Sequence, residues 1–299
     1  MRSIRSTVVE GLLWAKSNKE LFLDPVKSKQ FFDERRIENA KPYEIPSKYE
    51  TRYHIQKKVF HDMDCYVLGQ EGFQKHILYL HGGGYVNQPF DQHWTFLQEI
   101  CRRTHSRIVV PIYPKAPNYT VVTSFEKVLP LYERMLETTS PSDMTIMGDS
   151  AGGGFALALA QLLKEKELPQ PDDIILLSPW LDITMQNPDI DALDLESKDP
   201  MLGKEALIQW GEAYRGNIEP SNYLLSPING SLTGLGRLSI FIGTHELFLA
   251  DALKFKTLCE EQKIPLNYYE YDKMNHVFPV YPIPEAKQAR QQIAEIILT

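Results

Sequence analysis

A serine flanked by glycines is the residue of this chain best placed to do chemistry. It stands in Gly148-Asp149-Ser150-Ala151-Gly152, after a short apolar stretch and before an alanine- and leucine-rich segment that ends near Lys166. Gly-x-Ser-x-Gly between a strand and a helix forms a tight turn, which pushes the serine hydroxyl out to where a substrate can reach it. We therefore predict that Ser150 is the nucleophile of an acyl-transfer reaction.

A serine hydroxyl attacks only when a positioned base takes its proton, and that base is usually a histidine oriented by a carboxylate. In parallel α/β sheets these groups follow in the order serine, acid, histidine, each on a loop after a strand. His276 is the only histidine after His245, and it lies between the last predicted strand and the last predicted helix. The order predicts His276 as the base.

The orienting acid should follow the preceding strand, predicted at 238–242. Glu246 stands a few residues past that strand, and Asp251 lies farther along, at the predicted start of a helix. Aspartate at a helix start favours exposed amides. We predict Glu246 as the acid and keep Asp251 as the alternative, while His245 is expected to support the loop.

A second glycine motif can stabilise the anion that forms when the serine attacks. His81-Gly82-Gly83-Gly84 directly follows the predicted strand 76–80. Residues without side chains let backbone amides approach an oxygen closely, and the amide of Ala151 lies at the positive end of the helix after Ser150. Each such donor is typically worth about 10²–10³ in rate. The alternative is that these glycines form only a flexible turn, with His81 fixing it by hydrogen bonds.

These groups need a sheet that brings its strand ends together. Short apolar runs alternate with helical patterns, and this alternation favours a mostly parallel sheet of about eight strands with helices on both faces, an α/β fold in a single domain over residues 1–299. The predicted strands are 53–56, 64–68, 76–80, 107–112, 144–147, 174–177, 238–242 and 266–271. The predicted helices between or after them are 91–103, 124–137, 151–166 and 284–298.

One long insertion breaks this alternation, between the strand ending at Ser178 and the strand starting at Leu238. Insertions at the carboxyl ends of strands often lie over a binding crevice. We predict that residues 185–225, together with 1–50, form a helical cap, although a helix simply packed on the body is the alternative. Substrate-pocket residues are expected at Tyr85, Asp149, Trp210 and Tyr214.

The composition excludes several classes of function. The 299 residues carry a net charge of −7 and contain no basic run, so we expect no nucleic-acid partner. No stretch reaches the roughly 20 apolar residues of a membrane span, and Glu10 interrupts the amino-terminal apolar run, so no stable membrane association is expected. Cys65, Cys101 and Cys259 show no metal-ligand spacing, and no metal is predicted. With no clear targeting segment, the expected location is cytoplasmic.

The chain resembles the bacterial hormone-sensitive-lipase-like esterases of the α/β-hydrolase superfamily from about Ile77 to its end. The resemblance rests on His81-Gly82-Gly83-Gly84, Tyr113-Pro114-Lys115-Ala116-Pro117, Gly148-Asp149-Ser150-Ala151-Gly152-Gly153, Ser178-Pro179-Trp180-Leu181-Asp182, the Glu246 segment and His276. It implies Gly83, Gly84 and Ala151 as oxyanion donors, a cap, no cofactor and a possible homodimer. The chain departs from the family at Pro114-Lys115, where arginine and leucine are usual, and at Glu246, where aspartate is commoner.

The resemblance and the motifs together predict a serine carboxylic-ester hydrolase that acts on small-molecule esters with short to medium acyl chains. Two alternatives remain open. One is an aryl formamidase or amidase on the same fold. The other is a non-catalytic, ligand-binding relative, although such proteins tend to lose a triad member and this chain retains candidates for all three.

Overall fold

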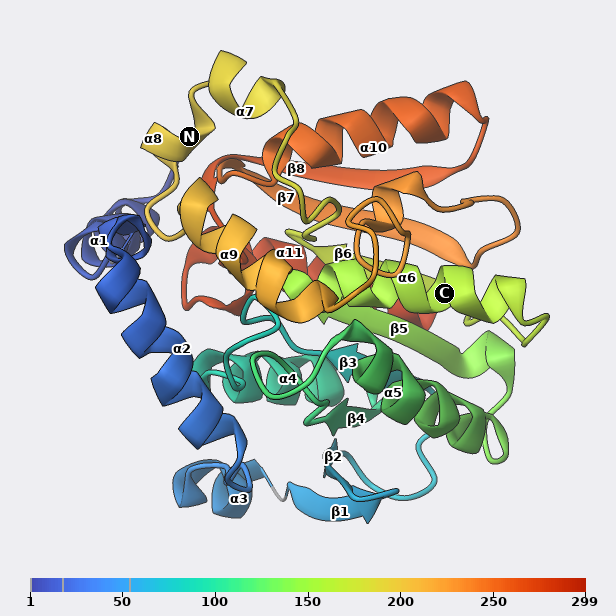
Figure 1. Cartoon of the computed structure of the whole chain (residues 1–299). Helices are drawn as coiled ribbons and strands as arrows, with labels where there is room; N and C mark the ends of the chain where they lie inside the picture. Colours follow the sequence, from blue (N-terminus) through green and yellow to red (C-terminus); the bar gives the residue numbers. More distant parts are fainter. Residues whose placement is uncertain (1, 18, 54) are drawn as a thin grey trace.

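The computed structural model describes residues 2–17, 19–53 and 55–299. Within these residues the centre is an eight-stranded sheet in the order β1-β2-β4-β3-β5-β6-β7-β8 (Figure 1). Strands β1 and β2 and strands β2 and β4 pair antiparallel, and all other neighbours are parallel. The strands are β1 Gln56–Phe60, β2 Met63–Leu68, β3 His76–Leu80, β4 Arg107–Pro111, β5 Met144–Asp149, β6 Asp173–Leu177, β7 Arg237–His245 and β8 Leu266–Asn275. The predicted mostly parallel α/β fold is confirmed.

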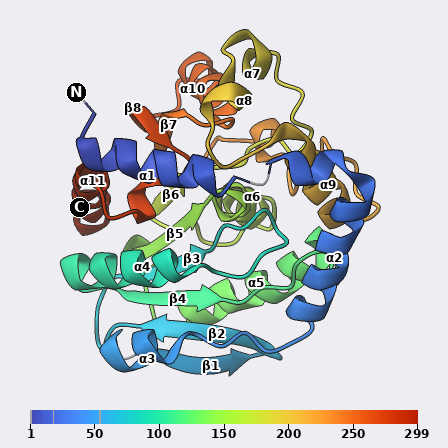
Figure 2. The same ribbon diagram turned by 90° about the vertical axis from the view of Figure 1, so that its left-hand side faces the viewer.

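Helices cover both faces of the sheet. On one face lie α4 (Asp91–Thr104) and α11 (Pro284–Leu298), and on the other α5 (Val121–Leu136), α6 (Ala151–Glu165) and α10 (Leu249–Glu261) (Figure 2). Ile77 and Tyr79 of β3 belong to the core under α4 and α11, whereas Leu78 and Leu80 belong to the core under α6. Because both faces are buried, the inner strands are continuous apolar runs and not alternating ones.

The first strand differs from the prediction of a strand at 53–56. Helix α3 (Ser47–Tyr53) ends at Tyr53, and β1 begins at Gln56; His54 lies outside the described residues. The register of β1 is set by its turn into β2, where His61 and Asp62 both have positive φ, 45° and 60°. Such two-residue turns match the twist of paired strands, so the turn fixes the pairing of residues 56–60 with residues 63–67.

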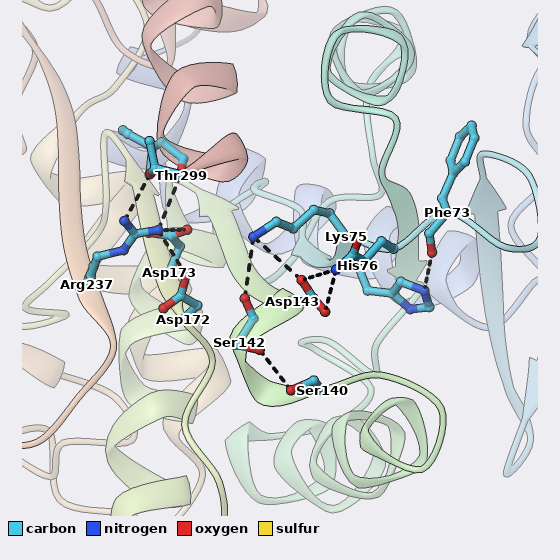
Figure 3. Close-up of polar contacts among 12 residues, drawn as sticks. Phe73, Lys75, His76, Ser140, Ser142, Asp143, Asp172, Asp173, Arg237 and Thr299 are labelled. Atoms are coloured by element: carbon cyan, nitrogen blue, oxygen red, sulfur yellow. Dashed lines mark hydrogen bonds and ion pairs between the residues drawn. The ribbon is translucent and has the colours of Figure 1, made fainter.

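Ion pairs hold together the amino ends of the parallel strands, the edge opposite the predicted site. Arg237, at the start of β7, reaches the Asp172 and Asp173 carboxylates at 3.0 and 2.9 Å and the Thr299 hydroxyl at 3.0 Å (Figure 3). Burial raises the pKa of Asp173 to about 6, against the opposing effect of Arg237. Lys75 lies 3.7 Å from Asp143 between β3 and β5. These contacts tie together the starts of neighbouring strands, at the edge of the sheet opposite the predicted site.

The amino-terminal segment and the insertion pack against each other. The first contributes α1 (Ile4–Ala15), η1 (Lys19–Leu23) and α2 (Pro25–Asn39), and the second contributes α7 (Asp189–Ala192), α8 (Leu195–Lys198) and α9 (Lys204–Arg215). Trp210 of α9 stacks on Phe31 at 5.9 Å and meets Phe22 edge-on at 5.5 Å. The Gln209 amide donates to the Phe22 carbonyl at 3.0 Å. We call this layer the cap; its role as a substrate cover stays a prediction.

No helix in the described part of the chain combines the length and apolar character needed to cross a bilayer. The remaining short elements are the single-turn helices η2 (Pro141–Asp143), η3 (Pro227–Asn229) and η4 (Phe278–Val280). The last of these follows β8 and leads the chain from the predicted base to α11.

Candidate active site

Ser150 stands on the sharp turn between β5 and α6. Its backbone has φ 54° and ψ −125°, a conformation that L-residues rarely adopt. A Cβ on Gly148 would lie 2.1 Å from the Gly152 carbonyl oxygen, and a Cβ on Gly152 would lie 1.9 Å from the Leu80 carbonyl oxygen. Only glycine fits at either position, which is the physical reason for the Gly-x-Ser-x-Gly pattern.

Three side chains that are far apart in sequence meet beside this turn. His276 Nε2 lies 2.9 Å from Ser150 Oγ, and His276 Nδ1 lies 2.7 Å from Glu246 Oε2. All three side chains are buried. Because a carboxylate only accepts, Nδ1 carries the proton and Nε2 is free to accept from the serine hydroxyl. The geometry can therefore move a proton from Ser150 to His276 while Glu246 holds the imidazole.

The other carboxylate oxygen of Glu246 is fixed by two donors. Glu246 Oε1 accepts from the Ser178 hydroxyl at 2.8 Å and from the Gly243 amide at 2.7 Å. Ser178 Oγ in turn accepts from the Val277 amide at 2.9 Å. Ser178 thus joins the loop of the acid to the loop of the base. The sequence showed Ser178 only as part of a family motif and gave no sign of this contact.

The alternative acid lies elsewhere. Asp251 is inside α10 and accepts from the Asn187 side chain at 2.9 Å. Its contacts do not include His276. Burial raises the pKa of Asp251 to about 6. His245 is also outside the cluster, since its ring lies 2.7 Å from Glu10 of α1.

A buried aspartate missed by sequence reasoning joins the cap to the catalytic loops. Asp199 accepts from the amides of Met201 at 2.7 Å and Leu202 at 2.9 Å, and from the amide of Leu247 at 3.0 Å. Burial raises the pKa of Asp199, while His276 and these amides act in the opposite direction. No local pattern in the sequence marks this role, because the donor at Leu247 is 48 residues away.

The loop after β3 presents the predicted oxyanion donors to the same cavity. Gly83 and Gly84 have φ values of 118° and 63°, and both line the cavity that contains Ser150 and His276. Within the described residues, the amides of these two glycines donate to no protein acceptor. Ala151 is the first residue of α6, where an amide has no carbonyl one turn earlier. These amides are available to a negatively charged oxygen.

Asp149 holds this loop against the serine turn. Its carboxylate accepts from the Tyr79 hydroxyl at 2.6 Å, from the Gly82 amide at 2.8 Å and from His93 Nε2 at 3.1 Å. His93 Nδ1 accepts from the Phe90 amide, which fixes the proton on Nε2. Burial raises the pKa of Asp149, but His93, Tyr79 and Gly82 outweigh it and keep the pKa below its ordinary value.

His81 has a structural contact pattern. Its Nδ1 lies 2.7 Å from the Gly82 carbonyl oxygen, and its ring stacks on Tyr113 with centroids 4.5 Å apart. The Tyr113 hydroxyl donates to the His81 carbonyl at 2.6 Å. Burial holds the pKa of His81 well below its ordinary value, so the ring is neutral. Nearby, burial lowers the pKa of Lys115 to about 7, and its amine donates to Gln88 at 2.9 Å.

The cavity in front of Ser150 has a volume of about 430 Å³. Of the predicted pocket residues, Asp149 and Trp210 belong to its lining, together with apolar residues that include Phe90, Leu202, Leu207, Val277 and Val280. A second cavity of about 200 Å³ shares Asn87, Met201, Leu202, Leu207 and Trp210 with the first. Trp210 therefore stands between the two cavities.

Tyr85 and Tyr214 differ from the prediction, because they are buried outside the cavity lining. Their rings stack on each other, with centroids 4.0 Å apart and an interplanar angle of 4°. The stack continues from Tyr85 to Trp180 at 5.7 Å and from Trp180 to Phe248 at 5.9 Å. Phe248 then meets the His276 ring edge-on at 5.1 Å. We call these five rings the aromatic column.

Comparison with known proteins agrees with this geometry. A family model described as alpha/beta hydrolase fold matches residues 77–280, which include every residue of the cluster. The chain belongs to the alpha/beta hydrolase fold family. The hydrolase is 30% identical to an esterase of Acinetobacter venetianus over 224 residues, which cover 73% of each chain.

Solved structures give the same result. A Staphylococcus aureus protein assigned as an esterase is 31% identical, with a TM-score of 0.87 over 91% of this chain and 92% of that chain. An esterase from the bacterial hormone-sensitive lipase family is 26% identical, with a TM-score of 0.76 over 92% of this chain and 98% of that chain. The resemblance inferred from the motifs is confirmed, and the hydrolase is, at the level of its family, an enzyme of the esterase type.

Among the described residues, no three histidine, cysteine, aspartate or glutamate side chains gather in a way that could hold a metal ion. Cys65 and Cys259 are buried, Cys101 is half-buried, and all three are free thiols.

Proposed function

We propose that the hydrolase cleaves carboxylic esters with short to medium acyl chains through an acyl-enzyme on Ser150. The observation that carries this proposal is the pair of contacts that joins Ser150 to His276 at 2.9 Å and His276 to Glu246 at 2.7 Å, beside a largely apolar cavity. The proposal needs no cofactor, and its partner is a small ester.

In the first step, Ser150 Oγ attacks the ester carbonyl carbon while His276 Nε2 accepts the hydroxyl proton. Glu246 stabilises the imidazolium that forms. The carbonyl oxygen becomes an anion and accepts hydrogen bonds from the amides of Gly83, Gly84 and Ala151. His276 then returns its proton to the departing alcohol, which leaves the acyl group on Ser150.

In the second step, water replaces the alcohol. His276 takes a proton from the water, which attacks the acyl-enzyme, and the same amides stabilise the second anion. The carboxylic acid leaves and Ser150 regains its proton. Short to medium acyl chains are favoured because a cavity of about 430 Å³ suits a small ligand better than a long-chain triglyceride.

Steady-state hydrolysis of p-nitrophenyl esters graded from acetate to dodecanoate tests the proposal. We expect kcat/KM to be highest for the short and medium esters, and Ser150→Ala to reduce kcat by about 10³ or more. Ser239→Ala is the matched control, because Ser239 is buried and hydrogen-bonded but lies within β7. Retention of activity by Ser150→Ala would overturn the proposal.

Two further measurements separate the alternatives. A faster turnover of an aryl formamide than of the matching ester would favour an amidase. Failure of a fluorophosphonate to label Ser150 would favour a ligand-binding relative without catalysis. The cytoplasmic location and the homodimer stay predictions, to be measured by cell fractionation and by sedimentation velocity.

A further inference from the structure

Helix α1 exposes apolar side chains to solvent, while Val9 and Leu13 on its inner side contact the core and the catalytic cavity. Ile4, Val8 and Leu12 recur every four residues, so they lie on one face of the helix, and their side chains are 84%, 57% and 57% exposed. Trp14 is also exposed at 42%. A surface helix normally buries its apolar stripe against the core and shows its polar side to water. We call the outward stripe of α1, made of Ile4, Val8 and Leu12, the apolar face.

Polar side chains on the inner side of the same helix help attach it to the body. The Ser3 amide and hydroxyl donate to the Glu285 carboxylate at 2.6 and 2.9 Å. Glu10 pairs with His245 at 2.7 Å and with Arg2 at 2.6 Å. The orientation is therefore fixed by specific polar contacts with α11 and the end of β7.

These contacts correct one step of the sequence argument. Glu10 interrupts the apolar run along the sequence, and that interruption argues against contact with a membrane. In the structure Glu10 faces the body and is paired, so the apolar face is not interrupted. Sequence order and helix face differ because successive residues are about 100° apart around the axis.

Two exposed basic residues accompany the apolar face along the chain, although the whole chain has a net charge of −7. Arg5 and Lys16 are exposed on or just beyond α1. Glu10 is the only acidic residue of the helix, and it points inward. Basic residues beside an exposed apolar stripe are typical of helices that lie in the interface of anionic lipid.

The apolar face is next to the entrance of the catalytic cavity. Leu13 and Lys16, from the end of this helix, belong to the lining of the cavity that contains Ser150. Figure 2 shows α1 lying across the side of the molecule that faces the viewer, with α2, α8 and α9 of the cap on the same side. A surface that contacts the apolar face would therefore also lie close to the opening through which an ester enters.

We propose that α1 docks the hydrolase reversibly, through its apolar face, on the surface of a lipid aggregate that carries anionic headgroups, so that esters held in that surface reach Ser150. The part of this proposal that concerns esters rests on the proposed function, but the docking itself does not. Docking of this kind buries the helix only to the depth of the headgroups and needs no membrane-spanning segment.

Co-sedimentation of the full chain with vesicles of phosphatidylcholine and phosphatidylglycerol tests the docking. We expect the wild type to bind, and the triple variant Ile4→Ser/Val8→Ser/Leu12→Ser to bind at least about tenfold more weakly, since each aliphatic side chain gains of order 1 kcal/mol on burial. The matched control is Ile37→Ser/Val59→Ser/Leu298→Ser, because these side chains are similarly exposed, at 61%, 67% and 57%, on other elements. The control should bind like the wild type.

Hydrolysis of soluble p-nitrophenyl acetate is measured on the same three proteins. It should be equal within about twofold, because none of the six side chains lines the cavity. A protein that binds vesicles but hydrolyses no ester would contradict the proposed function and leave the docking standing. Absence of vesicle binding by the wild type would overturn the docking, as would equal binding by the apolar-face variant.

The apolar face could instead join two copies of the chain, and the same variants separate this outcome. If the wild type sediments as a dimer that Ile4→Ser/Val8→Ser/Leu12→Ser converts to a monomer, the face is a self-association surface and the lipid proposal is wrong. The Trp14 side chain gives an independent signal. Its fluorescence should shift to the blue on addition of vesicles, and Trp14→Phe should remove that shift.

Discussion

The substitution Gly84→Ala tests the oxyanion loop and its contact with the cap. A Cβ on Gly84 would lie 2.1 Å from Trp210 Cε3 and 2.6 Å from Trp210 Cζ3, far inside van der Waals contact. The backbone φ of +63° adds about 1–2 kcal/mol for an L-residue. The Trp210 indole is packed between Phe22 and Phe31 and cannot move freely. The loop that contains Gly84 must therefore be displaced instead.

Displacement of the loop removes the Gly84 amide from the position where the anion forms. Loss of one such donor costs about 10²–10³ in kcat, or roughly 2.7–4 kcal/mol. We therefore expect Gly84→Ala to lower kcat on p-nitrophenyl butyrate by that factor, with a smaller change in KM. Gly72→Ala is the matched control. Its φ is +90°, but nothing lies within 4 Å of its added methyl group, so it has the backbone strain without the clash.

A double-mutant cycle with Trp210→Ala identifies the cause. If the indole displaces the loop, Gly84→Ala should cost at least about tenfold less in the Trp210→Ala background, because contacting residues are not additive. Thermal unfolding of all variants checks that each is folded. Wild-type kcat in Gly84→Ala, or strict additivity in the cycle, would refute this reasoning about the loop.

Three further variants probe the contacts around the site. Asp149→Asn leaves one of three buried donors without an acceptor. We therefore expect a loss of about 1–3 kcal/mol in the free energy of unfolding by urea and a fall in kcat. Unchanged values of both would contradict the role of Asp149 in holding the oxyanion loop against the serine turn. Ser178→Ala removes a donor to Glu246, and kcat should fall about tenfold or more with KM nearly constant, as judged by steady-state kinetics. Lys115 has a pKa of about 7 when folded and an ordinary value of 10.5 when unfolded. Between these values the unfolded chain holds a proton that the folded chain has lost, so stability rises with pH by up to about 1.4 kcal/mol per pH unit. In Lys115→Met the free energy of unfolding, measured by urea titration, should not rise between pH 7.5 and 9. Equal slopes of this free energy against pH for the wild type and Lys115→Met would contradict the prediction.

The parts of the fold that the sequence predicted well depend on local chemistry. The turn at Ser150 needs glycine on both sides because Gly148 and Gly152 touch backbone carbonyls, and such a need is visible in the sequence itself. The inner strands were found because burial on both faces makes them continuous apolar runs. Chain order predicted that Glu246 and His276 lie near Ser150, because parallel strands deliver their carboxyl ends to one edge, and the side chains of these three residues contact one another in turn.

The rest depends on contacts between distant segments. Tyr85 and Tyr214 were expected in the pocket, but their rings stack on each other because α9 packs on the loop after β3. The role of Asp199 required a donor 48 residues away. The inward orientation of Glu10 required His245. None of these partners leaves a mark in the neighbouring sequence.

Through the aromatic column, the position of the His276 ring depends on how the cap helix α9 packs. Tyr214 belongs to α9 and stacks on Tyr85. Tyr85 stacks on Trp180, Trp180 stacks on Phe248, and Phe248 contacts the His276 ring. A tilt of α9 that is too small to unfold anything would therefore shift the ring that must line up with Ser150. On heating, the enzyme should lose activity at a lower temperature than the one at which its sheet unfolds.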